Sequence, residues 1–167
     1  MKYILLLLLS LNVARTFAQV NLVPNPGFES YIHCPSWSAQ IDSSFPWFQP
    51  NIFGSSTDYF NSCSINPQIS VPNNYFGNQT AKSGSAYAGF VLYCNLTLGY
   101  REYLEVMLTD SLIQGETYCV MFHIVSAKTN SKYGIDAIGA YLSVDSVLYN
   151  DPIASIPYLL FFFAETI

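Results

Sequence analysis

The amino-acid sequence predicts an all-β fold, arranged as an antiparallel β-sandwich, on three observations. Aromatic residues make up 16% of the 167 residues and charged residues only 10%, so strand-favouring residues abound while good helix formers such as Glu, Lys and Ala are scarce. Turn signals recur about every ten residues between short alternating segments, as in β-sandwiches. No stretch longer than about two turns has the periodicity of an amphipathic helix.

The strands expected in the first 100 residues are short, and turn residues bound each of them. Residues 32–80 are dense in Pro, Ser, Asn and aromatics, which indicates long ordered loops with few strands. The expected strands are two within 21–31, on either side of a Pro-Asn-Pro-Gly turn, one around Trp47, one over 57–60, and one over 86–93 after a turn at 82–85.

The clearest alternation lies in residues 101–108 and 117–126. In the second segment Tyr118 and Phe122 face one side, and His123 faces the other. A further strand is expected over 135–144, with 147–149 continuing the sheet.

The last apolar run, Leu159–Phe163, does not alternate. It fits a central strand, a sorting remnant or translation past a frameshift. A jelly roll has about eight strands, and only six or seven are counted. We therefore favour a truncated or frame-shifted end, with the last strands missing after about residue 157.

The first eighteen residues predict a secretory signal peptide. Lys2 supplies a positive charge, an apolar run follows from Ile4, and Thr16-Phe-Ala18 offers small residues for cleavage before Gln19. The run is too short to span about 30 Å of hydrocarbon, and no second stretch is long enough to be a transmembrane segment. We expect an exported chain with one domain over 19–167.

The charge balance excludes nucleic acid as a partner. Eleven acidic residues face six basic ones, for a net charge of −5, and removing 1–18 leaves four basic residues and a net charge of −7. Such a chain offers no basic surface to displace counterions from phosphates.

Four cysteines in an exported chain favour disulfides, with three possible pairings. We favour Cys34–Cys63, because both lie in turn-rich sequence and their bond would close a long irregular segment. Cys94 and Cys119 are then either a second disulfide or two partly buried free thiols. Their spacing matches neither a zinc site nor a redox pair.

Several short motifs follow one another along residues 20–150. They include Asn21-Leu-Val-Pro-Asn-Pro-Gly-Phe-Glu29, Gly84-Ser-Ala-Tyr-Ala-Gly89 and Leu112-x-x-Gly-x-x-Tyr118-x-Val-x-Phe122. In this order they resemble carbohydrate-binding modules with a galactose-binding-like jelly roll, found at the N-terminus of exported bacterial surface proteins. Such modules often precede an OmpA-like or a C-terminal sorting domain. The resemblance implies an extracellular or outer-membrane location, or a periplasmic one.

The resemblance also implies a ligand and an ion. The expected partner is a polysaccharide or glycoconjugate, because sugar rings stack on exposed aromatic faces beside acids and amides. The candidate ligand-binding residues are Trp37, Trp47, Tyr59, Tyr75 and His123. Aromatic residues are more often packed than displayed, so core packing is the alternative for each. Glu29 matches the family position for a structural calcium ion, the one cofactor implied.

Catalysis is not expected. The sequence has no Gly-x-Ser-x-Gly elbow to expose a nucleophile. Glu102 and Glu105 lie three residues apart on a strand and so point to opposite faces, which favours solvated edge charges over a glycosidase pair. Two alternatives to a glycan-binding module stay open: a structural or protein-interaction module of the cell envelope, and a secreted hydrolase that depends on His123.

Overall fold

Strands dominate the regular structure of this chain. The computed structural model describes residues 20–50, 56–94, 100–131, 133–134, 138–147 and 160–163. These residues contain no α-helix and one short 3₁₀-helix, η1 (Ile41–Ser43). The strands are β1 (Asp58–Asn61), β2 (Asn73–Asn74), β3 (Gly77–Asn78), β4 (Ala86–Gly89), β5 (Leu104–Met107), β6 (Ala140–Ser143) and β7 (Leu160–Phe163). The expected β-rich chain is thus confirmed.

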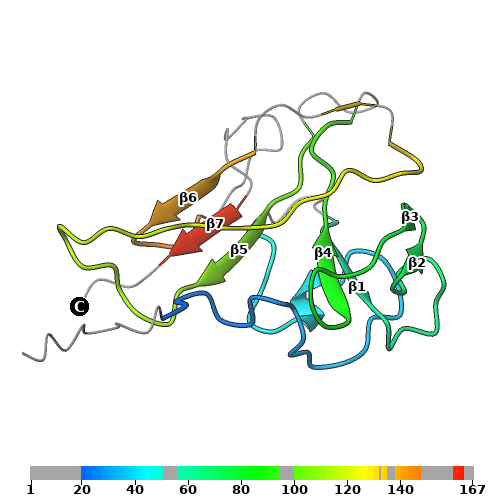
Figure 1. The fold of residues 1–167 in the computed structure, drawn as a ribbon, viewed down its shortest axis with the longest axis horizontal. Coiled ribbons are helices and arrows are strands. Elements are labelled where there is room, and N and C mark those ends of the chain that lie inside the picture. The colour runs from blue at the N-terminus through cyan, green and yellow to red at the C-terminus, as the bar shows by residue number, and fades with distance from the viewer. Residues whose placement is uncertain are drawn as a thin grey trace, which may run out of the picture.

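The strands form three small sheets (Figure 1). β1 pairs with β4 antiparallel, with Asp58 opposite Gly89 and Asn61 opposite Ala86, and β2 pairs with β3 as a tight antiparallel hairpin. In the third sheet β7 lies between β5 and β6 and runs parallel to both. The expectation of an entirely antiparallel arrangement is therefore wrong for this sheet.

The expectation that Glu102 and Glu105 are solvated edge charges is also wrong. Glu102, Tyr103, Leu104, Glu105 and Val106 are all buried, so both faces of this segment are covered. Strands of parallel sheets are normally buried on both faces. The alternation of residues 101–108 correctly predicted a strand at the position of β5.

Residues 117–126, which alternate so clearly, form no strand. The segment runs over the surface without a turn or bend, and every residue in it is exposed. A β-strand is completed by the ladder bonds of a neighbour, and none of the described residues supplies one.

The two strands expected within 21–31 are absent as well, because a side chain organises this stretch. Asn25 adopts a φ of 46°. Its amide donates to the carbonyl oxygens of Ser30 and Phe45, and its Oδ1 accepts from the backbone N–H of Ser30. Such local bonding by Asn competes with a sheet ladder.

The core joins the first loops to β1, β4 and β5. Its buried apolar members are Ile41, Trp47, Tyr59, Ala86, Leu104, Val106 and Leu108. The segment after η1 reaches β5 directly, because Phe48 and Glu105 exchange backbone hydrogen bonds of 3.0 and 2.8 Å. This core fixes the base of the loops described next.

The expected signal peptide at 1–18 lies outside the described residues. Among the residues that are described, no helix is long and apolar enough to cross a bilayer.

Candidate functional site

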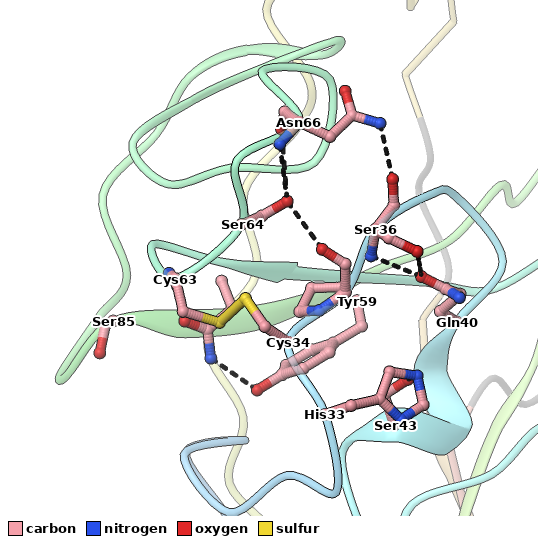
Figure 2. The surroundings of a disulfide bond; sticks show 12 residues. His33, Cys34, Ser36, Gln40, Ser43, Tyr59, Cys63, Ser64, Asn66 and Ser85 are labelled. Carbon is pink, nitrogen blue, oxygen red and sulfur yellow. Dashed lines mark hydrogen bonds between the residues drawn. A yellow bond between two sulfur atoms is a disulfide. The ribbon is translucent and has the colours of Figure 1, made fainter.

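A disulfide joins two neighbouring loops at one end of the β1–β4 sheet (Figure 2). Cys34 and Cys63 are bonded, with their Cα atoms 5.9 Å apart, which confirms the predicted pairing. Two hydrogen bonds run beside it: Ser64 Oγ donates to the Pro35 carbonyl at 2.8 Å, and Asn66 Nδ2 donates to the Ser36 carbonyl at 2.9 Å. The loop after Cys34 is thereby tied to the loop after Cys63.

The first loop is also fixed from within by Gln40. Its Oε1 accepts from the backbone N–H groups of Ser36 and Trp37, at 2.8 and 2.9 Å. On the other side, the N–H of Ala39, whose φ is 60°, donates to Asp58 Oδ1 at 2.7 Å. The turn that carries Trp37 is therefore held by side chains from three parts of the chain.

On this fixed turn the Trp37 side chain is 62% exposed. Ile65, on the loop tied to it, is 99% exposed. An apolar ring on a rigid loop loses little conformational freedom when it binds a ligand. We name residues 34–40 and 63–66 the tied loops; they form the candidate functional site.

Two of the predicted ligand-binding residues belong to the core instead, so these predictions are wrong. Trp47 is 4% exposed, its indole N–H donates to the Asn25 carbonyl at 2.8 Å, and its ring lies 5.0 Å from that of Phe28. Tyr59 is fully buried on β1, where its hydroxyl donates to the Phe28 carbonyl and accepts from Asn61 Nδ2. Both fill the interior and satisfy their polar atoms there, so neither can meet a sugar.

The other two predicted residues are exposed but lie in other places. Tyr75 is 55% exposed between β2 and β3, next to Phe76. His123 is exposed on the unpaired segment. No hydrogen bond or ring contact of the described residues joins either of them to Trp37. The five predicted residues are thus not one site.

Glu29 has a structural partner. Its carboxylate accepts from the backbone N–H groups of Ser85 and Ala86, at 2.9 and 3.1 Å, and from the Ser85 hydroxyl at 3.0 Å. It thus joins the first loop to the turn before β4. The described residues contain no group of three His, Cys, Asp or Glu side chains arranged for a metal ion. Calcium binding stays a prediction from the resemblance.

The second disulfide is not formed. Cys94 is half-buried and Cys119 is exposed, and both are free thiols. Cys119 lies on the unpaired segment, which no disulfide attaches to the rest of the fold. The alternative of two free thiols holds.

Three carboxylates on or near β1 and β5, those of Asp58, Glu102 and Glu105, are withdrawn from solvent. Glu102 and Glu105 were predicted to be solvated. Glu102 is 1% exposed and accepts from the hydroxyl groups of Ser56 and Tyr100 and from the backbone N–H of Val91 at 2.7 Å. Burial raises the pKa of the Tyr100 hydroxyl to about 12. The hydrogen bond with Ser56 lowers this pKa in part, and Glu102 raises it further. The network connects three distant stretches of chain, which is a structural role.

Glu105 is fully buried, and its pKa is raised by desolvation. Its Oε1 accepts from the N–H of Val147 at 3.1 Å, whereas its Oε2 has no hydrogen-bond partner among the described residues. Desolvation likewise raises the pKa of Asp58 to about 6. The hydrogen bond from the Ala39 N–H lowers this pKa in part, and the nearby charge of Glu102 raises it further.

Glu102 and Glu105 share no hydrogen-bond partner among the described residues, whereas the two carboxylates of a glycosidase flank one bond. A Ser–His contact does exist, between Ser43 Oγ and His33 Nε2 at 2.9 Å, but Ser43 is 3% exposed and cannot attack a bound substrate. Comparison of the chain with protein-family models, curated proteins and solved structures found no match.

Proposed function

We propose that this chain is an exported, non-catalytic carbohydrate-binding module of the bacterial cell surface, with a jelly-roll fold. One observation carries the proposal: Trp37 is displayed on a turn fixed by a disulfide and five hydrogen bonds. The ring is large, flat and mostly exposed, as stacking on a sugar requires.

The polar surroundings of Trp37 support the same ligand class. Amide side chains of Gln40 and Asn66 and the hydroxyl of Ser36 lie in the tied loops. A ring that stacks together with a few placed polar groups is the usual composition of a small-ligand site. A site for a negatively charged ligand would contain basic side chains, and residues 34–40 and 63–66 contain none.

The test is retention on insoluble cellulose, chitin and peptidoglycan. Trp37→Ala is expected to weaken binding at least about tenfold, equivalent to about 1.4 kcal/mol, with an unchanged melting temperature. Tyr75→Ala is the matched control, since it removes another exposed ring and is expected to leave retention unchanged. Equal loss in both variants, or no retention of the wild-type chain, contradicts the proposal and favours a structural or protein-interaction module.

A further inference from the structure

Residues 117–127 run without a turn or bend and pair with no strand among the described residues. The segment runs between a turn at Gly115, whose φ is 89°, and the N–H of Lys128, which donates to the Phe76 carbonyl at 3.0 Å. The N–H of Glu116 still donates to the Ile113 carbonyl at 3.2 Å, but from Thr117 to Ala127 no backbone N–H or carbonyl makes a hydrogen bond to any described residue. Figure 1 shows it in yellow-green as one long, smooth path across the front of the molecule.

This segment is also the most apolar exposed stretch among the described residues. Its large side chains have exposed fractions between 36% and 77%, on both sides of the backbone; they are Tyr118, Val120, Met121, Phe122, Ile124 and Val125. Eleven extended residues span about 34 Å. A long, flat, apolar strand with open backbone groups is a template for another strand.

We propose that this segment pairs antiparallel with the same segment of a second copy of the chain, about a two-fold axis at Phe122. The charges of the segment select this occupant and this register. Within residues 111–131 the only charged side chains are Glu116 and Lys128. Both are exposed, and they lie six residues before and six residues after Phe122.

An antiparallel self-pair centred on Phe122 places Glu116 of each copy opposite Lys128 of the other, at both ends of the ladder. Moving the axis by one residue pairs Glu116 with an uncharged residue, and a parallel pair sets Glu116 against its own copy. Opposite charges that face each other across a ladder are stabilising, and like charges are destabilising. The rest of the chain is net acidic, so two copies repel each other elsewhere. This segment differs, because an uncharged stretch lies between one acidic and one basic residue that attract their counterparts in a second copy.

The same register gives sensible cross-strand neighbours. Val120 faces Ile124 of the second copy, Phe122 faces Phe122, and on the other face Cys119 faces Val125. Identical contacts from both copies make a closed interface, which stops at two chains. The proposal is independent of carbohydrate binding.

The first experiment measures the oligomeric state of the full chain by analytical ultracentrifugation from 1 to 500 µM. The expected result is a reversible monomer–dimer equilibrium. Lys128→Glu is expected to weaken the dimer about tenfold, since it sets two acids against each other at both ends. Adding Glu116→Lys is expected to restore the affinity to within about threefold. A monomer throughout, open-ended assembly, or a dimer unaffected by Lys128→Glu overturns the proposal.

The second experiment fixes the register by oxidation in a Cys94→Ser background. Val125→Cys puts a thiol opposite Cys119 of the second copy, where opposing Cα atoms lie about 4.5–5.5 Å apart, within the range of a disulfide. We expect a covalent dimer on a non-reducing gel. Ile124→Cys, one residue away and on the other face, is the matched control and is expected to stay monomeric on the gel.

The unmodified Cys119 supplies a further check of the register. In the proposed pair the two Cys119 residues are offset by six residues, about 20 Å. The wild-type chain is therefore expected to form no Cys119–Cys119 disulfide on oxidation. Ready formation of that disulfide, or equal cross-linking of the Ile124 and Val125 variants, overturns the proposed register.

Discussion

Replacing Trp47 with alanine tests whether this tryptophan belongs to the core rather than to a binding surface. The side chain is 4% exposed, packs against Phe28 with a ring separation of 5.0 Å, and donates a 2.8 Å hydrogen bond to the Asn25 carbonyl. Truncation therefore opens a cavity and removes one of the two hydrogen bonds that the Asn25 carbonyl accepts, the other being donated by the Phe28 N–H.

The expected loss follows from these contacts. Buried Trp→Ala substitutions cost about 3–5 kcal/mol. For a chain of this size each kcal/mol lowers the melting temperature by about 2–4 °C, so a decrease of about 6–20 °C is expected. Trp47→Phe keeps much of the packing but loses the N–H donor, and about 0.5–1.5 kcal/mol of destabilisation is expected from the lost hydrogen bond, since the Asn25 carbonyl keeps the Phe28 N–H as a donor.

Urea unfolding followed by circular dichroism measures these differences. Trp37→Ala is the matched control, because the same residue type is removed from a 62% exposed position, and a change within about 0.5 kcal/mol is expected. If Trp47→Ala costs less than about 1 kcal/mol, or if Trp37→Ala costs as much as Trp47→Ala, the assignment of the two tryptophans is wrong.

Three further predictions concern the polar and covalent contacts. The folded-state pKa of Asp58 is raised from 3.8 to about 6, so the folded chain binds the proton more tightly, and the free energy of unfolding falls as pH rises between these values. Asp58→Asn is expected to flatten the plot of melting temperature against pH in this range. An unchanged slope would contradict the assignment of this pH dependence to Asp58. Gly84→Ala is expected to cost about 1–3 kcal/mol in urea unfolding, because φ is 67° and a Cβ would collide with the Glu29 carboxylate, whereas a neutral result refutes that geometry. Replacing Cys34 and Cys63 with serine opens a loop with a separation of 29 residues, for an expected loss of about 3.5 kcal/mol; in the wild type, thiol labelling of the unfolded chain should count two thiols before reduction and four after.

The sequence located many of the strands but not their neighbours. Segments centred on β1, β4, β5 and β6 were predicted, because alternation and turn residues are local signals. That β7 inserts between β5 and β6 in parallel depends on contacts between segments far apart in the chain. The same limit explains 117–126, whose alternation is real but whose ladder partner is missing from the described residues.

The candidate site was predictable in part. Turn-rich sequence around Cys34 and Cys63 indicated their disulfide, and Trp37 is one of five aromatic and His residues singled out. The local sequence does not show that Trp37 is exposed and Trp47 is buried. Trp47 is buried through contacts with the Asn25 carbonyl and the Phe28 ring, which lie some twenty residues earlier in the chain. Gln40, which holds the turn of Trp37 through its side chain, was not predicted; its position three residues after Trp37 is the only signal.

The central claim is that Trp37 contacts the ligand, and one fluorescence measurement tests it most directly. In Trp47→Phe, Trp37 is the only tryptophan of the chain. Its emission is recorded with iodide as quencher, with and without a soluble fragment of the polysaccharide that retains the wild type. Shielding of Trp37 from iodide in proportion to bound ligand is the predicted result. Unchanged quenching at saturating ligand would show that the glycan binds elsewhere and would contradict the account.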